Sequence, residues 1–102
     1  MNSSAATENE IKQISTGKAV YKTACMTCHG ENFDGRGDAG KYLKPPPRNL
    51  VTDPFIAGDS ALEIYATVTN GLKGKAMPSF KLLSESDRQA VSAYIVFVRL
   101  KK

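Results

Sequence analysis

Cys25-Met26-Thr27-Cys28-His29 is a run of five consecutive residues that holds both cysteines and the only histidine of this 102-residue chain. A Cys-x-x-Cys-His sequence is typical of the site at which a c-type haem is attached. Two thiols one helical turn apart can form thioether bonds with the two vinyl groups on one edge of a porphyrin. The histidine that follows then lies below the ring and can bind the iron. The motif therefore predicts Cys25 and Cys28 as covalent anchors and His29 as an axial ligand.

Three other kinds of site could use the same pattern. The first is half of a structural zinc site, but a closed zinc site needs four protein ligands, and the chain has only these cysteines and this histidine. The second is a thioredoxin-like redox pair, which expects a βαβ context that the sequence does not show. The third is a small surface disulfide that happens to precede a histidine. Haem attachment is favoured because the pattern is specific and leaves no cysteine over.

Length and composition suggest a single small domain at residues 11–102, preceded by a flexible polar arm at residues 1–10. Hydrophobic residues make up 41% of the chain and aromatic residues 8%. Such a core is thin, and a porphyrin would add a large apolar plate to it. No run of 18 apolar residues exists, so no membrane span is predicted.

The polar N-terminus lacks the apolar segment of a signal peptide. Covalent haem attachment takes place in an exported compartment. We therefore predict a periplasmic or otherwise exported protein whose signal peptide or anchor is absent from this chain. The formal net charge of +4 favours acidic partners. Nucleic acid is not expected, because no dense Lys/Arg run with interleaved aromatic residues is present.

The spacing of apolar residues predicts three helices. The first covers about residues 11–28, the second residues 60–70 and the third residues 84–100. Ser60-Ala61-Leu62-Glu63 is a capping-box pattern that opens the second helix, and Gly71 would end it. Loops at residues 30–49 and 71–83 separate the helices, with an irregular segment at residues 50–58 that holds at most a short helical turn.

An iron with two axial ligands needs a group on the face of the ring opposite His29. Met1 lies on the polar arm and Met26 lies inside the attachment segment, which leaves Met77. Met/His is a known axial pair. Pro78 would stiffen the loop that presents the Met77 sulfur. The alternative role for Met77 is that of a gap-filling core residue.

From about residue 17 to residue 100, the chain resembles the class I c-type cytochromes, which are single-haem, all-helical electron carriers. Gly17, Tyr21 and Cys25 match the glycine, the aromatic residue and the first haem cysteine of that family's N-terminal helix. Tyr94 matches the aromatic residue of its C-terminal helix. The resemblance implies an all-α cytochrome c fold whose N- and C-terminal helices cross around one covalently bound haem c.

The resemblance also implies further site residues. Met77-Pro78 match the family's methionine loop. A proline after the attachment motif typically offers its carbonyl to the ring N–H of the ligating histidine. Pro46 is our choice among the prolines at residues 45–47, and the long segment at residues 31–44 leaves that choice open. Arg48 is either a partner of a haem propionate or a solvated loop residue.

These residues predict an electron carrier rather than an enzyme. With His29 and Met77 both bound, no iron site would be open for substrate, and the electron would pass through an exposed porphyrin edge. The protein is expected to be monomeric. Lysines near the haem edge would meet an acidic redox partner or merely solvate the surface. They are Lys18, Lys22, Lys73, Lys75 and Lys81.

Two other functions stay open at this point. The first alternative is that the chain is a haem c domain or subunit of a larger oxidoreductase. The second is that it is a haem enzyme or gas sensor, which requires that Met77 does not bind the iron and leaves one iron site open.

Overall fold

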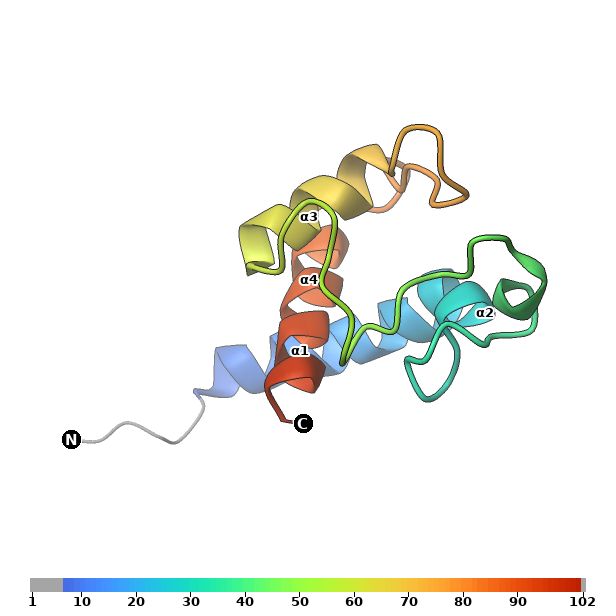
Figure 1. Cartoon of the computed structure of the whole chain (residues 1–102). Coiled ribbons are helices and arrows are strands. Elements are labelled where there is room, and N and C mark those ends of the chain that lie inside the picture. The colour runs from blue at the N-terminus through green and yellow to red at the C-terminus, as the bar shows by residue number, and fades with distance from the viewer. Residues whose placement is uncertain (1–6, 102) are drawn as a thin grey trace.

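The computed structural model describes residues 7–101, and over that range the chain is helical without any strand (Figure 1). The helices are α1 (Glu8–Val20), α2 (Met26–His29), α3 (Ala61–Asn70) and α4 (Glu85–Leu100). A π-helical stretch, Tyr21–Cys25, joins α1 to α2. The predicted first helix is therefore one nearly continuous helical segment that ends in the attachment motif.

The first helix begins earlier than predicted. The Thr7 hydroxyl accepts the Glu10 N–H at 3.1 Å, and the Glu10 carboxylate accepts the Thr7 N–H at 2.8 Å. This is a complete capping box, which fixes the start of the helix at Glu8. The assignment of residues 8–10 to a polar arm is wrong, because polar residues with a good cap form the first turn. The rest of the predicted arm, residues 1–6, lies outside the described residues.

The other two predicted helices are confirmed to within one residue. Ser60 and Glu63 form the expected capping box at the start of α3, and Gly71 follows its last residue with a φ of 72°. At the start of α4, the Ser84 hydroxyl accepts the Asp87 N–H at 3.1 Å. Both starts follow from side-chain oxygens that satisfy the free N–H groups of a first turn.

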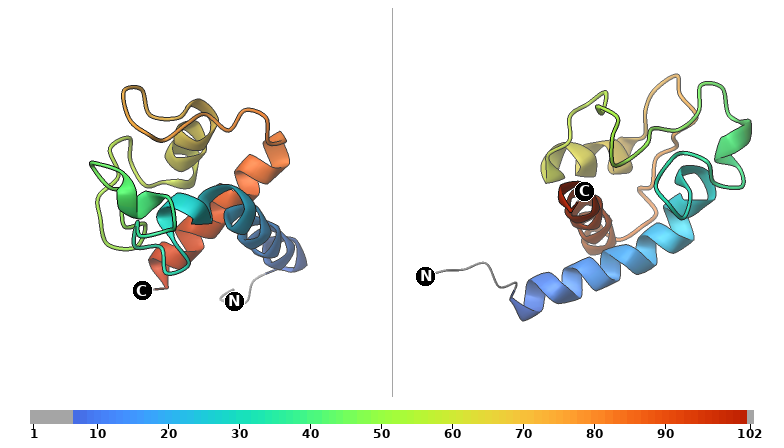
Figure 2. Two further views of the ribbon diagram at one scale, coloured as in Figure 1. Left: turned by 90° about the vertical axis from the view of Figure 1, so that its right-hand side faces the viewer. Right: turned by 60° about the horizontal axis from the view of Figure 1, so that its bottom comes forward.

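The helices α1 and α4 cross in close contact (Figure 2). Gly17 permits the contact: a Cβ placed on it would clash with the carbonyl of Ala90 and would lie 2.6 Å from the Cβ of Tyr94. Beside the crossing, the ring centroids of Tyr21 and Tyr94 are 5.9 Å apart. The ring of Phe33 lies 4.8 Å from that of Tyr21 and joins the pair. The expected crossing of the terminal helices and its aromatic pair are confirmed.

The core follows from this crossing, because α4 packs against both α1 and α3. Val91 is completely buried at its centre. The buried apolar side chains around it come from the first helical segment, from the irregular segment at residues 50–58 (the 50s loop), and from α3 and α4. They are Val20, Tyr21, Cys25, Leu50, Ile64, Val68, Tyr94 and Ile95. The core thus extends as far as the first cysteine of the attachment motif.

Gly17→Ala should destabilise the protein even though alanine favours helix. The gain in helix propensity is about 1 kcal/mol, whereas forcing a methyl group into this packed contact costs about 1–3 kcal/mol. A denaturant titration of the haem-loaded protein measures the free energy of unfolding. Thr16→Ala, at an exposed neighbouring position, is the control and should change it by less than about 0.5 kcal/mol. An equal effect of both variants would contradict the close contact at Gly17.

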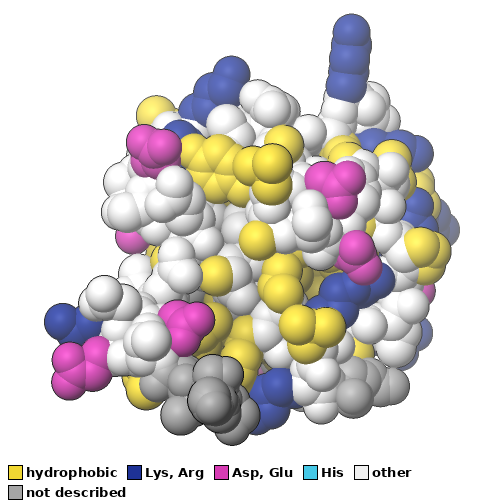
Figure 3. All heavy atoms as spheres, turned by 90° about the vertical axis from the view of Figure 1, so that its left-hand side faces the viewer, with side chains coloured by type: hydrophobic (Ala, Val, Ile, Leu, Met, Phe, Trp, Pro, Cys, Tyr) yellow, Lys and Arg dark blue, Asp and Glu magenta, His cyan; other side chains and the backbone are white. Residues whose placement is uncertain are grey.

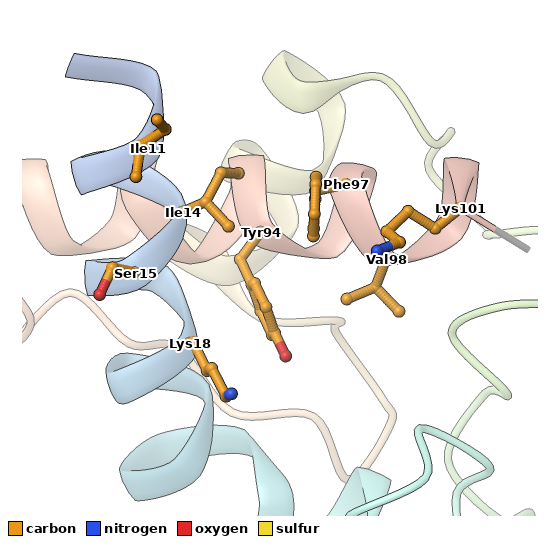
Figure 4. A pocket seen from close by; sticks show the side chains of 8 residues that line it. All are labelled: Ile11, Ile14, Ser15, Lys18, Tyr94, Phe97, Val98 and Lys101. Carbon is orange, nitrogen blue, oxygen red and sulfur yellow. The ribbon is translucent and has the colours of Figure 1, made fainter. Parts of the chain in front are cut away.

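A groove of about 570 Å³ lies between α1 and α4 on the outer side of the crossing (Figure 4). Its lining includes Ile14, Tyr94 and Val98, with Lys18 and Lys101 also present. No cysteine, histidine or methionine lines it, so its chemistry does not suit a haem. Seen from the left-hand side of Figure 1, the molecule shows apolar side chains intermixed with charges of both signs (Figure 3).

Candidate haem site

A cavity of about 620 Å³ separates the attachment motif from the loop that carries Met77. All of the site residues predicted from the sequence line it. They are Cys25, Cys28, His29, Pro46, Arg48 and Met77. Its other walls are mostly apolar and come from the 50s loop, α3, the loop after α3, and α4. They include Leu50, Phe55, Ile64, Val68, Phe80 and Ile95. In Figure 1, α2 and the loop after α3 both lie on the right-hand side of the molecule.

The attachment motif is held at both ends. The π-helical stretch Tyr21–Cys25 leads into it, and such insertions are frequent at functional sites. The Tyr21 hydroxyl donates a 2.6 Å hydrogen bond to the carbonyl of Gly30, the residue directly after His29. Burial, with Cys28 nearby, raises the pKa of the Cys25 thiol to about 12. Both cysteines are free, so both thiols are available to form thioether bonds.

These facts weaken the three alternatives to haem attachment. Cys25 and Cys28 are free cysteines and are not joined by a disulfide bond. A thioredoxin-like pair works through a thiolate of lowered pKa, whereas burial acts on Cys25 in the opposite direction. Within residues 7–101, no group of three or more His, Cys, Asp or Glu side chains is arranged to hold a metal ion.

The loop after the motif fixes the backbone of α2. The last carbonyls of a helix have no partner inside the helix, and here three loop N–H groups bind them. The pairs are Gly35 to His29 at 2.8 Å, Gly37 to Cys28 at 3.1 Å and Ala39 to Thr27 at 2.8 Å. Glycine is required at position 40, because a Cβ there would clash with the Cys28 carbonyl. The length of this loop therefore serves to hold the attachment motif.

The imidazole of His29 is oriented by a backbone carbonyl. Its Nδ1 lies 3.2 Å from the carbonyl oxygen of Arg48. The tautomer with the proton on Nδ1 donates to that oxygen and keeps the lone pair on Nε2, which is the form that binds a metal. Burial lowers the pKa of His29, and the hydrogen bond to Arg48 opposes this only in part. The neutral imidazole is therefore favoured.

The prediction that Pro46 supplies this carbonyl is wrong, because the acceptor is two residues further along. The carbonyl of Pro47 faces Gly35, where a Cβ would clash with it. The chain then turns, so that the next carbonyl, that of Arg48, reaches His29. Pro46 lines the cavity, and its contact with a bound ring stays a prediction. The same holds for a contact between the Arg48 side chain and a propionate.

A compact turn follows Arg48 and fixes its direction. The Asn49 side-chain oxygen accepts the N–H groups of Val51 and Thr52 at 2.9 and 3.0 Å. The Asp53 carboxylate accepts the N–H of Asn49 at 2.9 Å. Asparagine and aspartate commonly bind nearby backbone in this way. An asparagine soon after three prolines is the sequence signal that could have located this turn.

The loop that carries Met77 is anchored on both sides of that residue. The Met77 carbonyl accepts the N–H of Leu72 at 3.0 Å. Gly71 lies against the same carbonyl, and a Cβ there would come within 2.8 Å of it. After Pro78, the Ser79 hydroxyl donates to the Thr69 carbonyl at 2.7 Å. Met77 is half-buried at the cavity wall, in a loop that returns to the end of α3.

Two of the five predicted lysines line a pocket, and they line different ones, whereas Lys22, Lys73 and Lys81 are not among the lining residues of either. Lys75 lines the cavity, together with Lys44, which the sequence did not single out. Lys18 lines the groove between α1 and α4 instead. Sequence position alone did not reveal that the side chain of Lys18 lies on the outer face of the crossing.

The lining of the cavity fits a haem. Its volume lies within the range of about 300–1,000 Å³ that is usual for cofactor pockets. Its apolar walls suit a porphyrin, and two thiols, a neutral imidazole and a thioether are the groups in it that could attach or ligate a haem. Charged side chains also line it, namely Lys44, Arg48, Asp53 and Lys75. Cys25 and Cys28 are the residues that would attach the group covalently, and His29 and Met77 are the residues that would bind its iron.

Comparison with known proteins gives the family. Residues 12–95 match the family described as cytochrome c oxidase, cbb3-type, subunit III. The chain belongs to this family. The cbb3-type cytochrome c oxidase subunit CcoP of Azospirillum brasilense is 35% identical over 80 residues, which are 78% of this chain and 26% of that protein.

Other relatives carry cytochrome names as well. The cytochrome bc1 complex cytochrome c subunit of Mycobacterium leprae is 29% identical over 96 residues, which are 88% of this chain and 29% of that protein. The chain thus spans less than a third of these curated relatives. A chain of the reducing HAO-like protein complex of Kuenenia stuttgartiensis has a TM-score of 0.70 at 29% identity, over 92% of this chain and 43% of that one.

The predicted class is confirmed by the family and by the helical structure. The cbb3 subunit III match identifies a c-type cytochrome domain with the cytochrome c fold. Its general function is electron transport by a c-type haem. Within residues 7–101, the longest apolar helical stretches fall short of what a membrane crossing requires.

Proposed function

We propose that this chain carries single electrons through one covalently bound haem c whose iron is ligated by His29 and Met77. The observation that carries the proposal is the cavity that both attachment cysteines, His29 and Met77 line together. The bound haem supplies a one-electron iron couple. With two protein ligands on the iron, no coordination site is left for a substrate, which favours a carrier over an enzyme.

Each side chain has a distinct task in this proposal. The thiols of Cys25 and Cys28 bind the porphyrin edge. The hydrogen bond from His29 to the Arg48 carbonyl holds the imidazole at a fixed angle and makes it a stronger base. The thioether of Met77 is a soft, neutral ligand that favours reduced iron and raises the potential.

The apolar walls complete the site. Side chains such as Ile64, Val68 and Phe80 exclude water from the cavity. When water is excluded, the energies of the oxidised and reduced states depend strongly on the surrounding dipoles. The walls therefore help to set the reduction potential. A site held by loops that are anchored on both sides needs little rearrangement when the electron arrives or leaves.

The same electron-transfer function could be carried out within a larger protein or complex. The relatives are named as subunits of an oxidase and of a bc1 complex, and the chain matches 26% and 29% of their lengths. We propose that the present chain acts as such a haem c domain, whose first helix begins at Glu8, in an exported compartment such as the periplasm. It would be monomeric by itself and would exchange electrons with other redox proteins.

Carbon monoxide binding and a redox titration test the proposal. The haem-loaded protein should titrate reversibly as a one-electron couple, and its ferrous form should not take up carbon monoxide. A haem enzyme or gas sensor with an open site would bind carbon monoxide readily in the ferrous state. Such binding would reject ligation by Met77 and, with it, the carrier function.

Lys75, which is exposed and lines the mouth of the cavity, gives a test of partner docking. Lys75→Glu should lower the association rate with an acidic redox protein by about threefold to tenfold at low salt. Lys12→Glu changes the net charge equally but lies on the exposed surface of α1, away from the cavity lining. Stopped-flow electron transfer measures both variants, and added salt should remove the difference between them. Equal rates for the two variants at low salt would reject docking at the cavity mouth.

A further inference from the structure

Arg99, near the C-terminal end of α4, holds the 50s loop. Its Nη1 donates to the Leu50 carbonyl at 2.8 Å and its Nη2 to the Asp53 carbonyl at 2.6 Å. Its Nε lies 3.3 Å from the Asp59 carboxylate, and its guanidinium lies 4.2 Å from the ring centroid of Phe55. The side chain is only 16% exposed. One residue thus fixes the loop at several points.

Arg88, in the first turns of α4, makes a similar set of contacts with the last part of the loop that carries Met77. Its Nη1 donates to the carbonyls of Lys81 and Leu83 at 3.0 and 2.9 Å. Its Nη2 lies 3.3 Å from the Tyr65 hydroxyl, and its guanidinium lies 5.5 Å from the centroid of that ring. Arg88 therefore ties the end of the methionine loop to α3 and α4.

The loop held by Arg99 leads directly to the histidine ligand. Leu50 and Asp53 belong to the turn that follows Arg48, and the carbonyl of Arg48 is the acceptor for His29. If the turn moves, that carbonyl moves with it. The segment held by Arg88 leads instead to the other ligand, because Lys81 follows Phe80 in the same anchored loop as Met77.

We propose that Arg99 is a positioning residue for His29 and that Arg88 is a positioning residue for Met77. This inference rests on the proposed function, because it requires both residues to bind the iron. The two ligand loops contain no strand, and segments of this kind are mobile unless side chains hold them. Arginine suits the task because its planar fork can bind two carbonyls together, which a lysine ammonium does not do in the same way.

Arg99→Met and Arg88→Met test the two roles, and each variant is the control for the other. In the reduced, haem-loaded protein, exchange of the His29 Nδ1 proton with solvent is measured by NMR. It should become about tenfold faster in Arg99→Met, as expected for a weakened hydrogen bond. In Arg88→Met it should stay within about twofold of the unmutated protein.

The second measurement is the affinity of the ferric protein for added imidazole, which competes with Met77 for the iron. Arg88→Met should bind imidazole about tenfold more tightly, because the methionine loop is less firmly held. Arg99→Met should change this affinity by less than about twofold. If a Met variant does not retain haem, Arg99→Lys and Arg88→Lys keep the charge and the side-chain length, and should give smaller changes in the same directions.

The pattern of results separates this inference from the proposed function. Met77→Ala should itself raise the imidazole affinity, and if it does not, Met77 is not a ligand and the proposed function fails. If Met77→Ala behaves as expected but both arginine variants shift both measurements alike, or shift neither, the separate positioning roles are rejected. A change in which each arginine affects only its own ligand supports them.

Discussion

A chain in which both Cys25 and Cys28 are replaced by alanine is expected to lose all of its haem on acid–acetone extraction, whereas the unmutated chain keeps it. Axial bonds from His29 and Met77 do not survive denaturing acid, because the imidazole is protonated and the folded loops are lost. Thioether bonds are covalent and do survive. Mass spectrometry of the extracted polypeptide measures the difference as one haem-sized increment.

The single variants are the matched controls for this result. Cys25→Ala and Cys28→Ala each leave one thiol at the cavity, and each should retain haem through one thioether bond, in lower yield. A double variant that keeps its haem after extraction would show attachment elsewhere. An unmutated chain that releases its haem would overturn covalent attachment altogether.

Replacing Met77 with alanine is expected to leave the haem attached and to open one face of the iron. The ferrous form should then bind carbon monoxide, because the alanine side chain has no lone pair with which to bind the metal. The potential should fall by on the order of 0.1 V, a fraction of the roughly 0.8 V range that axial ligands span. The methionine-to-iron charge-transfer band of the ferric form should disappear.

Met26→Ala is the control for this variant, since Met26 is also a partly buried methionine but lies in α2 beside the attachment cysteines. It should leave the spectrum, the potential and the lack of carbon monoxide binding unchanged. If the Met77 variant also leaves them unchanged, or if the band is lost in the Met26 variant instead, Met77 is not the ligand.

Much of the fold was predictable because its signals are local. The capping pattern at Ser60 and the stop at Gly71 lie within a few residues of the helix ends that they define. Gly17, Tyr21 and Tyr94 were predictable through the resemblance to a family. The start of α1 was missed because its first turn is polar and shows no apolar periodicity, although Thr7 and Glu10 form a good cap.

The predicted site residues were brought together because the motif fixes one wall of the cavity and Met77 the other. The carbonyl that orients His29 was assigned to the wrong residue, since its identity depends on how the chain turns after the prolines. The contacts of Arg88 and Arg99 could not be predicted at all. The hydrogen bonds that hold the two loops go to backbone carbonyls, which are the same in every residue type and leave no pattern in the sequence.

The crossing of α1 and α4 also determines how the domain comes apart. It joins the two ends of the described chain, and both ligand loops lie between them as closed loops. The entropy of closing these loops is lost when the helices meet and is recovered when they separate. Because α4 carries Arg88 and Arg99, its departure releases both loops at once. We therefore expect cooperative unfolding, in which the iron ligands and the tertiary structure are lost in the same transition.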